Sequence, residues 1–189
     1  MKKIPCLFVR VFDGPRKSTL TDEVTPGCEW VMNGEGTASR KWDGTACAVI
    51  DGRLYRRYDA KNGKPAPPNG IPCQEPDPVA GHWPHWVLVD PDNHADRWIW
   101  EAFSTRVGKT ALPNGTYEAI GPRINGNPEG CTFHVLVRHG KTVLNPPRTK
   151  DGIRTFLEMN RMEGIVFAHP DGRMCKIRRV DFGLPWGSR

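Results

Sequence analysis

The sequence predicts an α+β fold of antiparallel sheets with flanking helices. Strand-like runs outnumber helical ones, and Asn-Gly pairs, which favour tight hairpin turns, recur along the chain. No internal repeat or low-complexity linker divides the 189 residues. We therefore expect a single domain over residues 1–189, long enough to bury a sizeable core.

Six strand-like runs bounded by turn residues are predicted to form strands. They are residues 47–50, 53–59, 116–120, 133–139, 164–169 and 175–180. The Asn-Gly pairs that mark turns begin at residues 33, 62, 69, 114 and 125. The stretch IPCQEPDPVAGHWPHW, residues 71–86, is rich in proline and aromatic residues and is predicted to be a structured loop.

Two segments are predicted to form helices, residues 94–107 and 151–160. In each, apolar residues recur at helical spacing and would lie on one face. They are Trp98, Ile99, Ala102, Phe103 and Val107 in the first segment and Ile153, Phe156 and Leu157 in the second. Thr149 or Asp151 is expected to cap the second helix, because either side chain can accept a hydrogen bond from the first turn.

The composition favours a soluble protein with a polyanionic partner. Mean hydropathy is −0.55, and no apolar run approaches the roughly 18 residues of a membrane-spanning helix. The start MKKIPCLFVRVF begins like a signal peptide, but Pro5 and Arg10 interrupt its apolar core, so a cytoplasmic location is expected. The net charge is +6, and basic residues are concentrated in the segments 53–64 and 172–179 within the body of the chain.

The cysteine and histidine pattern argues against zinc. The six cysteines are widely spaced, with no C-x-x-C pair, and are Cys6, Cys28, Cys47, Cys73, Cys131 and Cys175. Zinc sites need three or four ligands, usually from close pairs, so buried thiols are expected instead. His82 and His85 have metal-like spacing but no third or fourth ligand nearby, so they are assigned to the aromatic loop.

The run MCKIRRV near the end of the chain indicates an anion site. In a strand, alternate side chains face opposite sides, so Lys176 and Arg178 would share one face and Cys175 and Ile177 the other. Two cations backed by an apolar face form a fixed site for a negatively charged group. The alternative is a solvated edge strand protected by its charges.

Carboxylates and an aromatic pair precede this run. Glu163 opens the apolar strand of MEGIVF, where it would share a face with Ile165, and a turn joins that strand to Lys176. Glu163 and Lys176 would therefore lie on adjacent strands, and the alternative is a single cross-strand ion pair. Phe133 and His134 open another strand, where an aromatic ring could cover a base or simply pack in the core.

The order of these pieces resembles the covalent nucleotidyltransferase superfamily of DNA ligases, RNA ligases and mRNA capping enzymes. KWDG (41–44) is similar to the nucleophile motif, EGIVF (163–167) to the motif of the metal-linked glutamate, and CKIR (175–178) to the terminal phosphate-binding motif. The segments YEAIGPRINGNPEG and KIRRVDFGLPW resemble those of compact 5′-to-3′ RNA ligases. The resemblance covers residues 41–186 and implies a nucleotidyltransferase (adenylyltransferase) domain.

The resemblance implies that Lys41 attacks the α-phosphorus of ATP, expels pyrophosphate and retains AMP on its nitrogen. An amine attacks only when unprotonated, so it needs nearby cations or a metal to disfavour its charged form. Lys176 and Arg178 would do this and would hold the α-phosphate. Glu163 would bind Mg²⁺ or Mn²⁺, and Glu118 would contact the ribose. Arg40, Asp43 and Gly44 are expected to complete the nucleotide site around the nucleophile, and Phe133, with His134 as the rival, is expected to stack on adenine.

The sequence departs from the DNA ligase pattern in two places. Many DNA ligases and capping enzymes read K-x-D-G-x-R, but Ala46 stands where that arginine would be, so Arg57, or alternatively Arg56, is expected to bind the nucleotide. Only nine residues follow Val180 in this sequence, so no appended OB-fold domain is expected. Both departures favour a minimal RNA ligase.

The sequence therefore predicts an ATP-dependent RNA ligase that seals 5′-phosphate and 3′-hydroxyl ends without an obligate protein partner. One alternative is the same chemistry on DNA nicks or with GTP. Another is a non-catalytic RNA-binding module, although such a module would not need Lys41, Glu118, Glu163 and Lys176 together.

Overall fold

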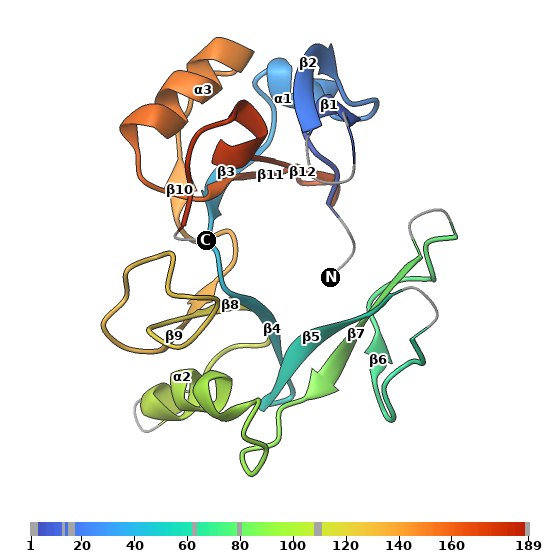
Figure 1. Ribbon diagram of the computed structural model, residues 1–189, viewed down its shortest axis with the longest axis vertical. Coiled ribbons are helices and arrows are strands. Elements are labelled where there is room, and N and C mark those ends of the chain that lie inside the picture. Colours follow the sequence, from blue (N-terminus) through green and yellow to red (C-terminus); the bar gives the residue numbers. More distant parts are fainter. Residues whose placement is uncertain are drawn as a thin grey trace. The chain divides into compact units, whose positions relative to one another are not determined.

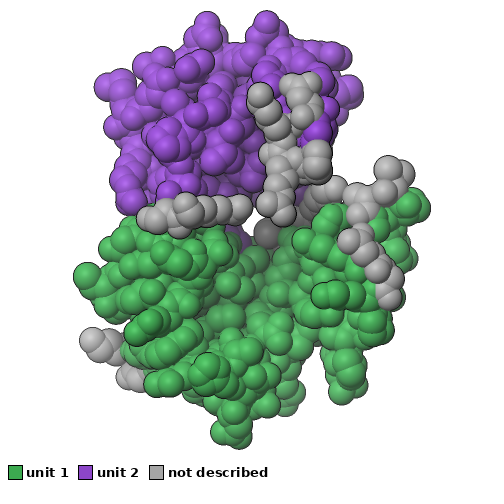
Figure 2. Space-filling model, viewed as in Figure 1, with its two compact units in different colours: residues 1–3, 43–138 green, residues 4–42, 139–189 purple. Residues whose placement is uncertain are grey.

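The structure is a computed structural model that describes residues 4–12, 14, 18–61, 64–78, 81–107 and 111–187. The chain forms two compact units, shown in Figure 2. Unit 1 contains residues 43–138, and unit 2 contains residues 4–42 and the segment from residue 139 onward. The boundary between Trp42 and Asp43 divides the KWDG motif, so Lys41 belongs to unit 2 and Gly44 to unit 1. A single domain over residues 1–189 stays a prediction.

Unit 1 is a six-stranded antiparallel sheet with one long helix (Figure 1). The strand order is β6-β7-β5-β4-β8-β9. The elements are β4 (Thr45–Ile50), β5 (Arg53–Lys61), β6 (Ile71–Pro72), β7 (His82–Leu88), α2 (Arg97–Val107), β8 (Gly115–Ile120) and β9 (Val135–Arg138). Helix α2 packs on one face of the sheet, where Ala102 and Phe103 join Cys47, Tyr117 and Leu136 in a buried core.

Unit 2 contains a four-stranded sheet of order β10-β3-β11-β12, together with the hairpin β1-β2. All its strand pairs are antiparallel. The elements are β1 (Phe8–Phe12), β2 (Ser18–Val24), α1 (Glu29–Met32), β3 (Thr37–Lys41), β10 (Val143–Leu144), α3 (Lys150–Met159), β11 (Gly164–Ala168), β12 (Met174–Arg178) and the 3₁₀ helix η1 (Arg179–Phe182). Ile153 and Leu157 of α3 pack against Ile165, Phe167 and Ile177 of the sheet, and apolar burial holds this unit together.

The chain that precedes β1 covers the outer edge of β12. Cys6 forms a parallel bridge with Lys176. The Leu7 N–H donates to the Lys176 carbonyl over 2.7 Å, and the Lys176 N–H donates to the Pro5 carbonyl over 2.9 Å. β12 is therefore paired along this edge, and the alternative prediction of a solvated edge strand is wrong. The pairing also fixes the backbone from which Lys176 extends.

The predicted strands and helices are present, with shifted ends. β9 begins two residues after Phe133, and Arg179 and Val180 lie in η1 rather than in β12. Thr149 is the residue that caps α3, since its side chain accepts the Gly152 N–H over 3.1 Å. The Asn-Gly pair predicted at Asn62 lies outside the described residues.

The predicted loop over residues 71–86 is wrong, because part of it forms β6 and β7. β7 pairs with β5 along its whole length, from His82 to Leu88. Pro84 fits there because its carbonyl accepts the Cys73 N–H over 2.8 Å and its missing N–H leaves that bond intact. Four further strands, β1, β2, β3 and β10, were also not predicted. Because turn residues surround them, their alternation is short and weak.

At the level of fold class, the prediction of a mixed helix and sheet protein with mostly antiparallel strands is confirmed. None of the helices within the described residues has the length and apolar character needed to cross a bilayer.

Candidate active site

Lys41, Lys176 and Arg178 leave one face of the unit 2 sheet. Lys41 at the end of β3 is paired with Gly164 of β11, and Gly164 is paired with Arg178 of β12. Directly paired residues point to the same face, and so do residues two apart in a strand, which adds Lys176 to this face. The opposite face carries Ile165 and Ile177 of the core, as the alternation predicted.

Glu163 is the hydrogen-bond partner of Lys41, whose ammonium group donates to the Glu163 carboxylate. The side chains are 22% and 11% exposed, so the pair is largely shielded from water. The sequence predicted that Glu163 would share a face with Ile165. Because β11 begins at Gly164, the strand alternation does not extend to Glu163, and its carboxylate lies toward Lys41 instead.

Lys176 is a partly buried cation close to two others. Burial lowers its pKa below the ordinary value, and repulsion from Lys41 and Arg178 lowers it further, whereas the carboxylates of Glu163 and Asp181 oppose the change. The nearby carboxylates therefore do not fully offset the burial of Lys176 and its repulsion by the neighbouring cations. The cluster is therefore suited to bind an anion with several negative oxygens.

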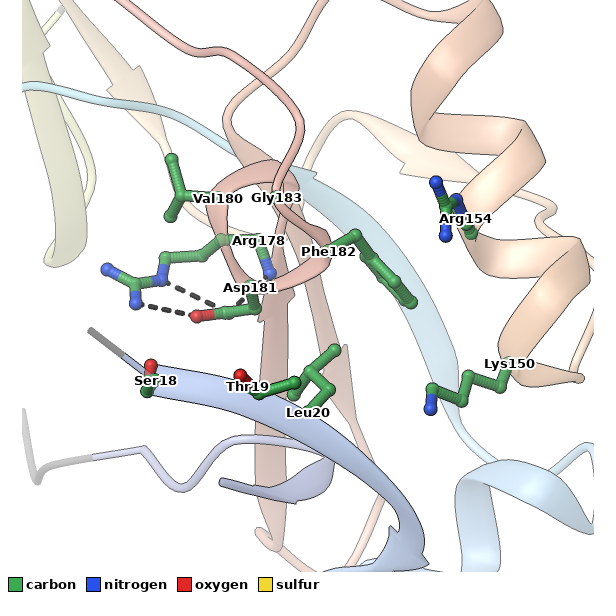
Figure 3. A pocket seen from close by; sticks show the side chains of 10 residues that line it. All are labelled: Ser18, Thr19, Leu20, Lys150, Arg154, Arg178, Val180, Asp181, Phe182 and Gly183. Carbon is green, nitrogen blue, oxygen red and sulfur yellow. Dashed lines mark hydrogen bonds and ion pairs between the residues drawn. The ribbon is translucent and has the colours of Figure 1, made fainter. Parts of the chain in front are cut away.

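Asp181 fixes the guanidinium of Arg178. The Asp181 carboxylate accepts the Arg178 backbone N–H over 2.9 Å, Nε–H over 3.2 Å and Nη2–H over 2.7 Å (Figure 3). These hydrogen bonds are the main cause that raises the pKa of Arg178. Asp181 is 6% exposed and was not predicted. The signal was the acid three residues after Arg178 in KIRRVDFG, where Asp181 is the third residue of a short helix.

Gly164 sets the close approach of β11 and β12. A Cβ atom at this position would lie 2.2 Å from the Ile177 carbonyl oxygen and 2.8 Å from the Arg178 Cα. These distances are too short for any side chain. The glycine of EGIVF is therefore a packing requirement of the strand pair that positions Arg178.

Arg40 is not brought to this cluster. It is paired with Ile165, so its side chain leaves the face opposite to Lys41. Its guanidinium stacks on the Trp42 ring, with the Arg40 Cζ 3.9 Å from the ring centroid. The prediction that Arg40 binds the nucleotide has no support from this placement.

In unit 1, Asp43 and Gly44 are held by acids and amides from other segments. The Gly44 N–H donates to Glu118 Oε1 of β8 over 3.1 Å. The Asp43 N–H donates to Glu129 Oε1 over 2.9 Å, and Asn125 Nδ2 donates to Asp43 Oδ1 over 2.5 Å. Glu129 and Asn125 lie in the loop between β8 and β9, and neither was predicted as a site residue. Their signal was the polar run NGNPEG, whose partner cannot be read from the sequence.

Gly44 also permits a close strand approach. A Cβ atom on Gly44 would lie 2.0 Å from the Ala119 carbonyl oxygen, so a larger residue would push β4 away from β8. Packing against β8 therefore explains the glycine at this position, and the role of Gly44 in a nucleotide site stays a prediction.

The strand register separates Arg57 from Arg56. Arg56 is paired with Cys47 on the face that α2 covers, and its Nε lies 2.5 Å from Asp96 Oδ1. Glu118 is paired with Ala46, one residue before Cys47, and therefore lies on the opposite face. Arg57 follows Arg56, so it shares the face of Glu118. Of the two arginines that the sequence left open, Arg57 is the one on this face.

Phe133 and His134 also have different surroundings. The His134 side chain stacks on Trp98 of α2, with ring centroids 5.0 Å apart, and its Nδ1 lies 2.8 Å from Glu101 Oε1. His134 Nε2 accepts the Arg123 N–H over 3.2 Å, so both ring nitrogens have partners within the protein. Phe133 is 66% exposed. Its ring is open to a ligand, whereas that of His134 belongs to the packing of α2.

The described residues contain no group of three or more His, Cys, Asp and Glu side chains arranged to hold a metal ion. The six cysteines, all within the described part of the chain, form no disulfide bond. His85 is buried in β7, and its Nδ1 lies 2.9 Å from the Trp83 carbonyl. Mg²⁺ keeps several waters and needs only one or two protein carboxylates together with substrate phosphates, so a single carboxylate such as Glu163 has the right chemistry for it. The expected metal at Glu163 stays a prediction.

Comparison with known proteins gives a family model and several relatives. The model described as RNA ligase 1 matches residues 101–189, which include Glu118, Glu163, Lys176 and Arg178 but not Lys41. The chain is 30% identical over 163 residues to RNA ligase 1 of Danio rerio, an alignment that covers 69% of this chain and 46% of that protein. It is 28% identical over 162 residues to RNA ligase 1 of Pongo abelii, with 65% and 50% covered.

RNA ligase 1 of Rattus norvegicus is 29% identical over 162 residues, with 69% of this chain and 47% of that protein covered. The chain thus spans about half the length of the curated relatives it matches. These comparisons confirm the resemblance that the motifs indicated: the chain is similar to RNA ligases of the nucleotidyltransferase kind.

Proposed function

We propose that this protein is an ATP-dependent RNA ligase that joins a 5′-phosphate to a 3′-hydroxyl through a lysyl-AMP intermediate. The similarity to RNA ligase 1 supports the class of reaction. One observation supports the mechanism above all others. Lys41 lies on the same sheet face as Lys176 and Arg178, and it contacts the carboxylate of Glu163.

In the first step, Lys41 Nζ attacks the α-phosphorus of ATP. An N–P bond forms, the bond from the α-phosphorus to the bridging oxygen breaks, pyrophosphate leaves with that electron pair, and Nζ loses its proton to the surroundings. Lys176 and Arg178 bind the oxygens of the α-phosphate, where negative charge grows in the transition state. Asp181 holds Arg178 in one orientation, so little reorganisation is needed when the phosphate reacts.

Glu163 would hold Mg²⁺ or Mn²⁺, and the bound ion would supply charge neutralisation for the phosphates. Without any ion, Glu163 also orients Lys41, because the ammonium donates to its carboxylate. In unit 1, the proposal assigns the ribose to Glu118, the adenine to Phe133 and a further nucleotide contact to Arg57. Arg57 and Glu118 share a sheet face, and the Phe133 ring is exposed, which supports these assignments.

The later steps transfer AMP to the RNA. The 5′-phosphate of one RNA end attacks the AMP phosphorus and displaces Lys41, and the 3′-hydroxyl of the other end then attacks the activated 5′-phosphate and releases AMP. The absence of disulfides among the described residues fits a reducing compartment, so we place the reaction in the cytoplasm. No obligate protein partner is part of the proposal.

Intact mass spectrometry after incubation with ATP and Mg²⁺ tests this proposal. We expect one adduct with the mass of AMP on the wild-type protein and none on Lys41→Ala. Lys41→Arg is the matched control, because it keeps the positive charge and removes the nucleophilic amine. An adduct that persists in Lys41→Ala would refute the assignment of the nucleophile.

A substrate panel separates the alternatives. Sealing of nicked DNA but not of RNA, or use of GTP in place of ATP, would identify a different member of the same superfamily. RNA binding with no adduct under any nucleotide would identify a non-catalytic RNA-binding module.

A further inference from the structure

Unit 2 contains a pocket in which most of the lining residues have no part in the proposed chemistry. Its volume is about 580 Å³. It is lined by Ser18, Thr19 and Leu20 of β2, by Lys150 and Arg154 of α3, and by Arg178 and residues 180–183 (Figure 3). All these residues belong to one unit, so the pocket is complete within it.

The walls of the pocket carry a surplus of positive charge. Lys150, Arg154 and Arg178 line it, and Asp181 is the only carboxylate among its described lining residues. Asp181 is buried and already accepts hydrogen bonds from Arg178. The pocket therefore presents cations on two sides with little negative charge to oppose them.

The partners of the two α3 cations are carboxylates in contact with water. Lys150 Nζ lies 2.5 Å from Asp22 Oδ1, and the Asp22 side chain is 95% exposed. Arg154 Nε lies 3.0 Å from Glu158 Oε1, and that pair is about half exposed on both sides. Exposed ion pairs contribute little to stability, so both cations can exchange these partners for a phosphate.

Apolar groups lie between the cations. The Phe182 side chain lies between the Arg178–Asp181 pair and the α3 cations in Figure 3, and Val180 is 44% exposed. Leu20 of β2 completes this apolar part of the lining. Phosphate-binding cations around an apolar centre match a nucleotide unit, in which a charged phosphate is joined to a ribose and a base.

Arg178 connects this pocket to the cluster around Lys41. Its side chain leaves the face that carries Lys41 and Lys176, and it also lines the pocket. A strand bound in the pocket would therefore share Arg178 with the cluster around Lys41.

We propose that this pocket binds the RNA strand that carries the 5′-phosphate, with Lys150 and Arg154 as contacts to its backbone phosphates. This inference rests on the proposed function, because RNA is the substrate only if the protein is a ligase of RNA. The polyphosphate of ATP has the same phosphate chemistry as the RNA backbone. Measuring RNA affinity and ATP requirement separately distinguishes these two occupants.

The test compares the double variant Lys150→Glu/Arg154→Glu with the matched control Lys141→Glu/Arg173→Glu. The control makes the same charge change at exposed positions of the same unit that do not line the pocket. The first measurement is the Kd for a 5′-phosphorylated single-stranded RNA oligonucleotide, read by fluorescence anisotropy at several salt concentrations. The second is the ATP concentration that gives half-maximal self-adenylylation.

We expect the pocket variant to weaken RNA binding at least tenfold relative to the control. The slope of log Kd against log salt should fall by about 1.4, which corresponds to two lost phosphate contacts on a single strand. The ATP concentration for half-maximal adenylylation should stay within twofold of wild type. Lys150→Gln/Arg154→Gln should show a smaller loss in the same direction, and it provides the test if the charge-reversed protein does not fold.

Equal RNA affinity in the pocket variant and the control would overturn the inference. So would a raised ATP requirement with unchanged RNA affinity, because the pocket would then bind the polyphosphate of ATP. If the wild-type protein forms no AMP adduct, the proposed function fails. A selective loss of RNA binding in the pocket variant would still support RNA as the occupant of the pocket.

Discussion

The two units hold their predicted site residues by different means. In unit 2, Lys41, Lys176 and Arg178 converge on one sheet face, and carboxylates offset part of their charge. In unit 1, Asp43 and Gly44 are held through backbone N–H groups that donate to Glu118 and Glu129. The first arrangement concentrates charge for chemistry, and the second fixes the shape of the chain. Substitutions in unit 2 should therefore act mainly on rate, and those in unit 1 mainly on geometry and nucleotide affinity.

Among the residues that support the proposed nucleophile, the largest effect is expected at Lys176, where a substitution should lower activity and raise stability. Lys176→Met removes one of the cations proposed to bind the α-phosphate, and self-adenylylation should slow by roughly 10²–10³-fold. The same change should stabilise the protein by about 1 kcal/mol at neutral pH, because a buried and repelled charge is removed. Single-turnover adenylylation and urea denaturation measure the two effects. A lower free energy of unfolding for the variant than for wild type at neutral pH would contradict the electrostatic explanation.

The pH dependence of this gain follows from the sign of the shift. The pKa of Lys176 is lowered in the folded protein from its ordinary 10.5, so below the folded pKa the charged lysine destabilises the native state. As the pH rises toward 10.5, the native lysine loses its proton first and the penalty disappears. The stability difference between Lys176→Met and wild type should therefore shrink between neutral pH and 10.5. A difference that is constant over this range would mean that packing, rather than charge, is its cause.

The second prediction compares the two glycines that allow close strand approach. Gly164→Ala in unit 2 and Gly44→Ala in unit 1 both place a Cβ atom against a backbone carbonyl, at 2.2 Å and 2.0 Å respectively. Each should lower the free energy of unfolding by roughly 1–3 kcal/mol, which chemical denaturation would measure. Gly52→Ala is a weaker control, since a Cβ there meets no atom within 4 Å, although the φ of +74° favours glycine.

The parts of this site that were predictable depend on local pattern. The faces of Lys176 and Arg178 follow from a period of two within one strand, which the residues around them display directly. The ends of the strands are harder, and Glu163 shows why. Its predicted face assumed that β11 extends one residue further than it does.

Long-range partners could not be predicted, because no local rule selects them. Lys41 and Gly164 are paired across 123 residues of sequence (164 − 41), and only tertiary packing brings β3 beside β11. The roles of Asn125 and Glu129 depend in the same way on how a polar loop returns to Asp43. β7 was missed because Pro84 signals a loop locally, whereas its neighbours in the sheet need only its carbonyl.

The third prediction concerns the neighbouring rings of unit 1. Phe133→Ala should raise the ATP concentration for half-maximal adenylylation by about tenfold, because stacking of a base on an aromatic ring contributes about 1–3 kcal/mol. Its thermal stability should hardly change, since the ring is exposed. His134→Ala should instead lower the melting temperature and leave the ATP requirement nearly unchanged, because it removes the contacts with Trp98 and Glu101. If both variants changed only the melting temperature, neither ring would bind the nucleotide.

The smallest effect is expected from two Arg–Asp pairs, one in each unit. The side chain of Asp181 in unit 2 is 3% exposed and holds Arg178, whereas the side chain of Asp59 in unit 1 is 26% exposed and contacts Arg57 over 3.2 Å. A buried carboxylate orients its partner more strongly, because water competes less for the hydrogen bonds. Asp181→Asn should therefore slow adenylylation at saturating ATP by roughly fivefold, or about 1 kcal/mol. Asp59→Asn should change this rate by less than twofold.

Asp181→Glu, which restores the charge at a longer reach, should recover part of the rate without a matching gain in stability. Such a recovery distinguishes positioning of Arg178 from general support of the fold, because a purely structural role would make rate and stability recover together.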